Sequence, residues 1–276
     1  MSATPGAKTM QARPDGEEPA PRPRAHFGEF ALLYAVSQMK VRYRQAWLGR
    51  LWNLLEPLLF LAVLTVVFSV LNQASVRDFA VYLFAGLVPW RYLERSIMGC
   101  VDSIADGGWL LRRIAAPAFV LPLTAWLQAS VDFVFSLLAL ALVLALLADS
   151  WTIHLACVLP AALLVGALGL GVGTMFAVLN VFARDVKPLL QFTLMLLFFS
   201  SPVLIKQSVA PADSPLAAIF AWHPLTPVVG LFQQPIYMHA WPPAADWLTV
   251  ASFAFGSLAL GWLLLVRLQQ RFYFYL

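Results

Sequence analysis

Residues 41–71 read VRYRQAWLGRLWNLLEPLLFLAVLTVVFSVL, a basic, tryptophan-containing segment that runs directly into a long apolar one. The apolar part, Leu54–Leu71, has 18 residues, and at about 1.5 Å per helical residue it crosses most of a hydrocarbon layer roughly 30 Å thick. The guanidinium groups of Arg42, Arg44 and Arg50 must stay in water or among lipid headgroups. The stretch therefore predicts a helix that enters a membrane from a basic flank.

The composition of the whole chain agrees with a membrane location. Of 276 residues, 61% are hydrophobic and only 12% are charged, whereas a soluble domain carries roughly 25% charged residues. Too few polar residues remain to coat a soluble surface of this size. Two cysteines exclude a disulfide framework and a multi-cysteine metal site. We therefore expect an all-α integral membrane protein.

Apolar segments along the chain predict six transmembrane helices, and the charge of their flanks predicts their direction. With a cytoplasmic amino terminus, fourteen Lys and Arg residues lie on the cytoplasmic side and two on the other. This asymmetry places both termini in the cytoplasm. The expected crossings are Leu54–Leu71, Phe79–Val101, Pro117–Ala148, Leu155–Ala183, Leu189–Ile205 and Trp247–Val266.

The amino-terminal residues divide into two parts before the transmembrane domain, which we place at 54–276. Residues 1–26 are rich in Pro, Gly, Ala and charge and predict a disordered cytoplasmic tail. Residues 27–53 contain an amphipathic pattern with basic side chains and Trp47, which predicts a helix lying along the membrane surface.

Two connections between the crossings have helical patterns of their own. The cytoplasmic loop 102–116 (DSIADGGWLLRRIAA) has a short helical pattern that ends in two arginines. The external segment 206–246 holds seven prolines and short apolar pieces such as LAAIFAW. Apolar pieces too short to span predict re-entrant or interfacial helices.

The sequence lacks the motifs of a nucleotide site or a catalytic centre. It has no G-x-x-x-x-G-K-[ST], no H-E-x-x-H, no G-x-S-x-G and no Cys/His cluster. We therefore expect no cofactor, no metal and no ATP bound by this chain. A run of small residues in the fourth crossing indicates close helix packing instead. It consists of Gly166, Gly169, Gly171 and Gly173.

Charged residues lie near the middle of two expected crossings. Arg91 and Arg95 are one helical turn apart in the second, and Asp132 lies near the middle of the third. Because an isolated charge at that depth costs roughly 3 kcal/mol or more, we expect Asp132 to pair with Arg91 or Arg95. A polar lining for a hydrophilic passenger and a proton relay are the alternatives.

Phenylalanines occur too deep in two crossings to belong to an interfacial aromatic belt. They either pack against lipid and core or line a pathway in which their rings stack on the C–H faces of sugars. These residues are Phe60, Phe68, Phe192, Phe198 and Phe199.

Several landmarks together resemble the membrane subunit of polysaccharide exporters, the ABC-2 type permeases. They are YRQAWLGRLWNLLEPLL (43–59), YLFAGLVPW (82–90), WLLRRIAAP (109–117), RDV (184–186) and SSPV (200–203). They occur in the family's order, and the first is the most distinctive. Two positions depart from the family pattern: His223-Pro224 stands in place of Asn-Pro, and Gln233 in place of an arginine.

The resemblance implies a homodimer that binds two copies of a separate ABC ATPase, which holds ATP and Mg. It makes 27–53 an interface helix, 206–246 an external gate, and the space between two permeases the channel. It also implies a coupling helix that docks on the ATPase. The expected coupling residues are Asp106, Trp109, Leu110, Arg112 and Arg113.

The resemblance further implies a lipid-linked polysaccharide, of O-antigen type, as the substrate in a bacterial inner membrane. Arg42, Arg44 and Arg50 are candidates to bind its pyrophosphate, because guanidinium forks match phosphate oxygens; anchoring to anionic lipids explains them equally well. The expected partners are a second copy of this chain, the ATPase, the glycan and membrane lipids. We expect no nucleic acid among them.

Other functions remain open at this point. The substrate of an exporter could also be capsule, teichoic acid, or a small lipid or drug. A membrane-embedded transferase would need a convergent catalytic set, which the sequence does not show. An ion channel or a scaffold would need no ATPase. Cys100 and Cys157 are expected near opposite membrane faces and therefore not to form a disulfide.

Overall fold

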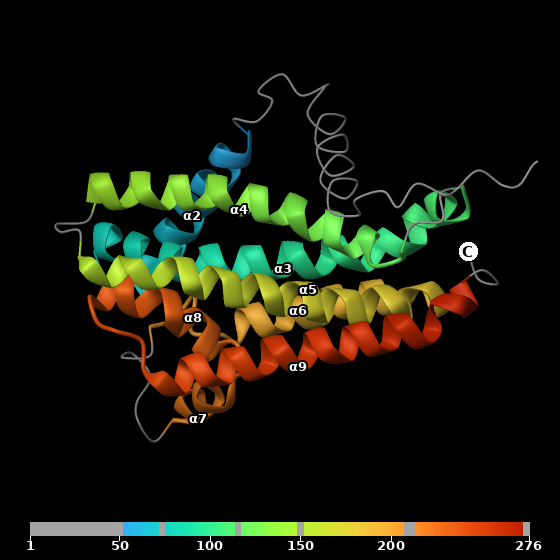
Figure 1. Cartoon of the computed structure of the whole chain (residues 1–276). Coiled ribbons are helices and arrows are strands. Elements are labelled where there is room, and N and C mark those ends of the chain that lie inside the picture. Colours follow the sequence, from blue (N-terminus) through green and yellow to red (C-terminus); the bar gives the residue numbers. More distant parts are fainter. Residues whose placement is uncertain (1–51, 72–74, 114–116, 148–151, 207–213, 273–276) are drawn as a thin grey trace, which may run out of the picture.

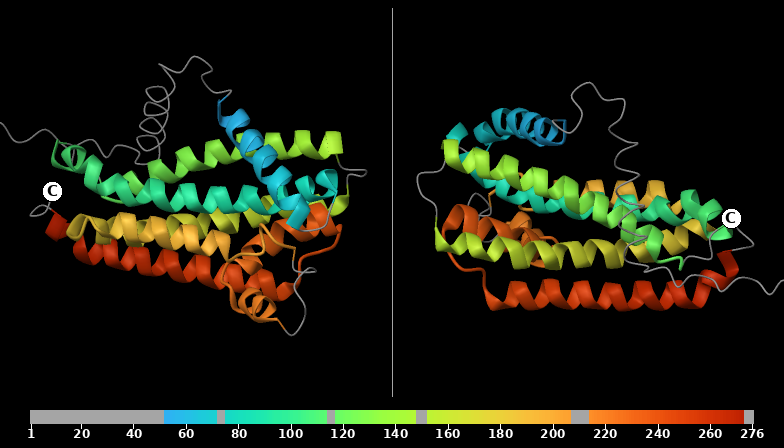
Figure 2. Two further views of the ribbon diagram at one scale, coloured as in Figure 1. Left: turned by 180° about the vertical axis from the view of Figure 1, so that it is seen from behind. Right: turned by 45° about the horizontal axis from the view of Figure 1, so that its top comes forward.

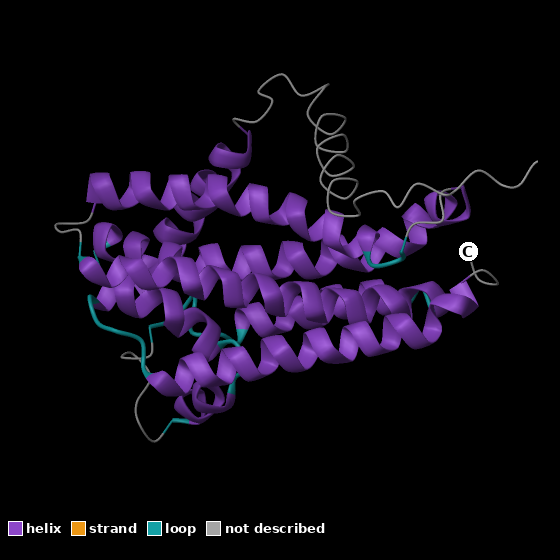
Figure 3. Ribbon diagram, viewed as in Figure 1, coloured by secondary structure: helices purple, strands orange, loops and turns teal. Residues whose placement is uncertain are grey.

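The structure is a computed structural model that describes residues 52–71, 75–113, 117–147, 152–206 and 214–272. The expected tail at 1–26 and the expected interface helix at 27–53 lie outside the described residues, except for the last two positions of the latter. Within the described ranges all regular structure is helical (Figure 3). The all-α prediction is confirmed for this part of the chain.

Long helices lie side by side in one elongated bundle (Figure 1). α5 (Val158–Phe182) packs between α3 (Val76–Arg113) and α9 (Ala244–Leu268), and α4 (Val120–Leu147) packs on the far side of α3. α2 (Trp52–Leu71) crosses α3 and α4 obliquely, as Figure 2 shows most clearly.

Contacts between distant residues define the two ends of the bundle. At one end, Arg77 Nε donates to the carbonyl oxygen of Leu147 at 2.7 Å, so α3 begins where α4 finishes. At the other end, Lys187 Nζ lies 2.8 Å from Asp102 Oδ2. We call these the Arg77 end and the Asp102 end. In the expected topology they are external and cytoplasmic, respectively.

Within the described ranges, three helices are long and apolar enough to cross a membrane, and their outer faces are apolar. They are Val120–Leu147, Ile153–Phe182, which combines the 3₁₀ turn η2 (Ile153–Cys157) with α5, and Ala244–Arg271, which combines α9 with the 3₁₀ turn η5 (Gln269–Arg271). Leu138, Leu163 and Leu248 are 56%, 72% and 72% exposed. Exposed apolar surface of this extent marks a lipid or protein contact. The chain is therefore a multi-pass membrane protein.

α3 is longer than the crossing expected at Phe79–Val101. Its 38 residues span about 57 Å, well beyond a hydrocarbon layer of roughly 30 Å. The prediction of a loop at 102–116 with its own short helix is wrong up to Arg113, because α3 continues through those residues without a break. The helix runs through Gly107 and Gly108, and the next proline, which would end it, is Pro117.

α6 (Val186–Phe199) is shorter than the crossing expected at Leu189–Ile205. Ser200 and Ser201 stop it, since their hydroxyls donate to the carbonyl oxygens of Leu196 and Phe198, each at 2.7 Å. Pro202 follows and has no N–H to continue the helix. The 14 residues of α6 cover only about 21 Å.

The segment expected to be re-entrant forms short helices at the Arg77 end. α7 (Pro215–Trp222) and α8 (Thr226–Gln233) have eight residues each, and a π-helical turn, η4 (Gln234–Met238), follows α8. All three lie near the start of α9 (Figure 1). None of them is long enough to span a bilayer.

Glycines bring α5 close to its neighbours, which confirms the small-residue prediction. A Cβ at Gly169 would stand 2.6 Å from Ser96 Cβ, and one at Gly173 would stand 2.6 Å from Cys100 Cβ, both on α3. Gly171 faces the backbone of α9 at Ser257 and Leu258 in the same way. Real Cβ atoms do not approach so closely, so these contacts require glycine.

Candidate functional site

A cluster of charged side chains joins α2, α3 and α4 inside the bundle. Glu56 Oε1 on α2 lies 2.7 Å from Arg91 Nη2 and 2.7 Å from Arg95 Nη2 on α3. Both are charge-assisted hydrogen bonds at short distance. Arg91 also lies 3.9 Å from Glu94 one turn along α3.

Asp132 on α4 joins the same cluster through one of the two expected arginines. Its Oδ2 lies 3.8 Å from Arg95 Nη1, within ion-pair distance, and its side chain is 4% exposed. Arg91 is directed instead to Glu56 and Glu94. An ion pair stabilises Asp132, because an unpaired buried charge costs several kcal/mol.

Sequence reasoning missed Glu56, although a signal was present. Glu56 is the one charged residue between Leu54 and Leu71, and an acid within an apolar crossing needs a partner as much as Asp132 does. In the sequence, Glu56 also belongs to the segment 43–59 that carries the family resemblance. Its position near the start of α2, which tilts across α3, brings it to Arg91 and Arg95.

One side of this cluster is open. The side chains of Arg91 and Arg95 are 25% exposed, and those of Glu56 and Glu94 are 36% and 34% exposed. Arg91 Cζ lies 4.9 Å from the ring centroid of Phe60, so an aromatic ring borders the open side. Charges exposed to hydrocarbon are costly. The open side therefore faces protein or water.

The phenylalanines singled out in the sequence fall into two groups. Phe198 is 8% exposed and stacks on Trp90 with ring centroids 5.5 Å apart, so it supports the core. Phe192 and Phe199 on α6 are 54% and 59% exposed. Phe60 and Phe68 on α2 are half-buried.

Of the residues expected to couple to an ATPase, only part is described. Asp106 is exposed on α3 at the Asp102 end. The backbone of Trp109, Leu110, Arg112 and Arg113 is helical, but their side chains lie outside the described part, as do Arg42, Arg44 and Arg50. The nearby ion pair between Asp102 and Lys187 fastens the carboxyl-terminal half of α3 to the start of α6.

A second polar cluster lies at the Arg77 end. Lys206 Nζ donates to Asp78 Oδ2 and to the Tyr237 hydroxyl, both at 2.6 Å, and the Tyr237 hydroxyl donates to Asp78 Oδ2 at 3.1 Å. Burial lowers the pKa of Lys206, but its hydrogen bonds to Asp78 and Tyr237 outweigh burial and raise that pKa above its ordinary value. Lys206 therefore stays charged and joins α3 to η4.

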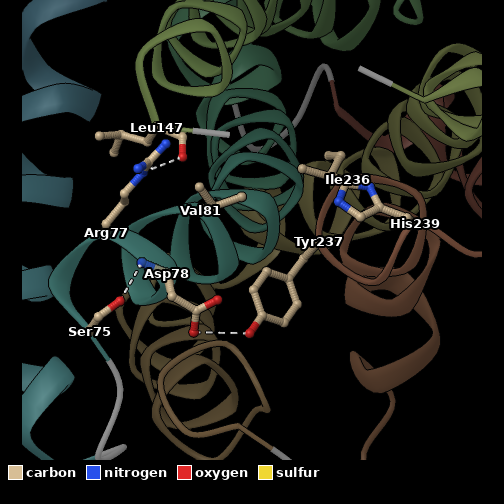
Figure 4. A pocket seen from close by; sticks show the side chains of 8 residues that line it. All are labelled: Ser75, Arg77, Asp78, Val81, Leu147, Ile236, Tyr237 and His239. Atoms are coloured by element: carbon tan, nitrogen blue, oxygen red, sulfur yellow. Dashed lines mark hydrogen bonds between the residues drawn. The ribbon is translucent and has the colours of Figure 1, made fainter. Parts of the chain in front are cut away.

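Two cavities adjoin this cluster and share Tyr237. Figure 4 shows the first, of about 280 Å³, where Asp78 points toward the Tyr237 hydroxyl and Arg77 toward Leu147. The second, of about 350 Å³, is lined by residues of α3, α8, η4 and the first turn of α9. Both open at the Arg77 end.

His223 makes the turn between α7 and α8. The Leu225 N–H donates to His223 Nδ1 at 3.2 Å, and His223 Nε2 lies 3.0 Å from Ser200 Oγ. A ring nitrogen that accepts a hydrogen bond carries no proton, so the imidazole is neutral with its proton on Nε2. Burial lowers the pKa of His223, against a hydrogen bond to the Leu197 backbone that raises it.

The structure also describes both cysteines and Gln233. Cys100 and Cys157 are both buried and free, as expected. Gln233, 5% exposed, directs its Nε2 at the carbonyl oxygens of Tyr82 and Pro202 at 3.5 and 3.4 Å. Among the described residues no group of three or more His, Cys, Asp or Glu side chains has the arrangement of a metal site.

These features together define a polytopic helical membrane protein with buried charge networks, the class to which membrane transporters belong. The family model of the ABC-2 type transporter matches residues 31–237. Because the match covers most of the chain, this protein belongs to the ABC-2 type transporter family, and it is a membrane transport subunit.

Proteins with similar sequences are known from Myxococcus xanthus and Klebsiella pneumoniae. The chain is 30% identical over 216 residues to the O-antigen export system permease protein RfbA of Myxococcus xanthus. The alignment covers 78% of this chain and 83% of that protein. It is 26% identical over 207 residues to a protein of the same name from Klebsiella pneumoniae, with 72% and 78% covered.

Proposed function

We propose that this chain is the transmembrane subunit of an ATP-driven exporter that moves a lipid-linked polysaccharide of O-antigen type across a bacterial inner membrane. The observation that carries the proposal is the 30% identity over 216 residues with an O-antigen export permease. The likeness extends over 78% of this chain and 83% of that protein.

The charged cluster of Glu56, Arg91, Glu94, Arg95 and Asp132 supports a hydrophilic passenger. Its open side needs a polar neighbour, and a second copy of the chain facing a water-filled pathway supplies one. Three carboxylates against two guanidinium groups give the cluster a formal charge of −1. A wall of this charge suits neutral hydroxyl-rich segments better than a dense polyanion.

The energy for export comes, in this proposal, from a separate ATPase. The chain has no P-loop for ATP, so ATP and Mg are bound by the partner. The carboxyl-terminal turns of α3, with Asp106 exposed, form the docking element, and the ion pair between Asp102 and Lys187 passes its movement to α6. We propose two permeases and two ATPases in each exporter, with both permease termini in the cytoplasm.

Deleting the gene for this chain tests the proposal in the organism that carries it. The expected result is loss of the polysaccharide from the cell surface, together with accumulation of lipid-linked glycan on the cytoplasmic side. Restoring the chain restores the surface glycan. Unchanged surface polysaccharide in the deletion strain would contradict the proposal.

Purification separates this proposal from an enzyme or a channel that works alone. We expect the tagged chain to purify with an ABC ATPase in a one-to-one ratio. Chain that purifies alone and still conducts ions or transfers a glycosyl group would favour the other classes.

A further inference from the structure

The second cavity at the Arg77 end has the size and the polarity of a small-molecule site. Its volume of about 350 Å³ lies at the lower end of the range of roughly 300–1,000 Å³ that small-molecule sites occupy. Its lining includes Thr226, Gln234, Lys206 and Tyr237, together with Asp246 in the first turn of α9.

The carboxylate of Asp246 keeps most of its hydrogen-bonding capacity. Gln234 Nε2 lies 3.4 Å from Oδ2, a long contact, and among the described residues Asp246 has no ion pair. A carboxylate has about four acceptor sites. Gly230 makes room for it, because a Cβ there would stand 2.9 Å from Asp246 Oδ2.

The other walls supply donors and acceptors at fixed positions. Lys206 is held by Asp78 and Tyr237 at 2.6 Å each, so its ammonium does not swing away. Thr226 Oγ1 donates its proton to the Phe220 carbonyl at 2.7 Å, so toward a ligand the hydroxyl acts as an acceptor. Gln234 offers both a carbonyl oxygen and an amide.

We propose that this cavity binds one neutral sugar residue, a step that rests on the export function proposed above and adds a binding site to it. Each sugar hydroxyl both donates and accepts, so it matches a wall that alternates a carboxylate, amides, a hydroxyl and an ammonium. Lys206 is neutralised by its ion pair with Asp78, which lies outside the lining, so Asp246 is the uncompensated charge of the cavity. The resulting negative balance opposes a phosphate or a uronate. The site holds part of the glycan at the end of the bundle where α3 begins.

Saturation-transfer NMR on the permease–ATPase complex in lipid nanodiscs tests the site. The probes are D-mannose, D-galactose and L-rhamnose, with D-glucuronate as the anionic comparison. At least one neutral sugar binds the complex, and its affinity falls about tenfold in Asp246→Asn and in Gln234→Ala, because each removes a hydrogen-bonding group from the wall. Gln269→Ala, which removes an exposed amide at the opposite end of α9, leaves the affinity unchanged.

Correct folding of the variants is measured separately, as copurification with the ATPase and as a single peak in size-exclusion chromatography. Failure of all three neutral sugars to bind overturns the site, as does equal affinity in the folded Asp246→Asn and Gln234→Ala variants. Binding of glucuronate as tight as that of the neutral sugars overturns its neutral character. Translocation of lipid-linked glycan by the unmodified complex is assayed in parallel, so a lost sugar site and a lost export function give different results.

Discussion

Glu56 Oε1 lies 2.7 Å from a guanidinium nitrogen of Arg91 and at the same distance from one of Arg95, so a single carboxylate on α2 joins two cations one turn apart on α3. α2 packs obliquely on α3 and α4. Through this contact of three charged residues, α2, which is otherwise mostly apolar, is held against α3 and the bundle.

Removing the charge of Glu56 should weaken the contact between α2 and α3. We expect Glu56→Gln to lower the free energy of unfolding by about 1–3 kcal/mol, since two charge-assisted hydrogen bonds are weakened in a partly buried site. Thermal unfolding of the detergent-solubilised protein measures the change. Glu94→Gln is the matched control, because the 3.9 Å contact of Glu94 with Arg91 is longer and should matter less. Equal effects of the two variants would show that Glu56 does not hold α2.

The interaction free energies of Glu56 and Asp132 with Arg95 should differ. Double-mutant cycles with Arg95→Met isolate each pair: Glu56→Gln measures the 2.7 Å contact and Asp132→Asn the 3.8 Å contact. We expect a coupling of about 1–3 kcal/mol for Glu56 and a smaller one for Asp132, because the 3.8 Å contact is longer than the 2.7 Å contact. A larger coupling for Asp132 would mean that the arginine pairs mainly with α4.

Glycine positions on α5 and α9 offer a matched packing test. Gly173→Ala should destabilise the protein by about 1–3 kcal/mol, because its Cβ would stand 2.6 Å from Cys100 Cβ in a packed interface. Gly256→Ala meets no atom within 4 Å and should be neutral or stabilise α9 by up to about 1 kcal/mol. Chemical unfolding in micelles compares the two. A harmless Gly173→Ala would contradict the close approach of α3 and α5.

The His223 turn predicts a dependence of stability on pH. Burial lowers the pKa of His223 below its ordinary value of 6.5, so the folded state favours the neutral ring. Above pH 6.5 the ring is neutral in both states and the turn is fully stable. As pH falls below 6.5 the unfolded chain binds the proton first, and the free energy of unfolding decreases until the folded ring is protonated as well.

Replacing His223 with asparagine distinguishes its contribution to the pH dependence of stability from that of other titrating groups. Asn accepts the N–H two residues on through its side-chain oxygen, as His223 Nδ1 does from Leu225. His223→Asn should therefore keep the fold and flatten the pH profile of the unfolding midpoint between pH 7.5 and 5.5. His239→Asn is the control: His239 is exposed with φ 52°, which Asn tolerates, and its replacement should leave the slope unchanged. The same slope in His223→Asn as in the unmodified protein would assign the pH dependence elsewhere.

Much of the arrangement of helices could be predicted because the length of an apolar segment must match the thickness of the hydrocarbon layer that it crosses. α4, α5 and α9 fall within a few residues of the crossings predicted for them. The close packing at Gly169, Gly171 and Gly173 followed from the spacing of small residues. These features depend on local composition, which a sequence displays.

The differences arise where a helix end is set by long-range packing or by side-chain capping. α3 continues past Asp102, and Lys187 on α6 forms an ion pair with Asp102 there, a long-range contact that periodicity alone does not reveal. α6 stops at Phe199 because two serine hydroxyls bond backward and Pro202 follows. The contacts of Glu56 could not be predicted because its partners lie 35 and 39 residues away on α3, which α2 crosses at an angle.

Reconstituted transport tests the central claim most directly. The permease and its ATPase are placed in liposomes with fluorescently tagged lipid-linked O-antigen glycan in the outer leaflet, where the ATPases also face outward. The account predicts that ATP moves the glycan into the lumen, that an ATPase with an inactivated catalytic glutamate does not, and that the permease alone does not. Equal movement with and without ATP hydrolysis would contradict it, as would nucleotide hydrolysis by the isolated permease.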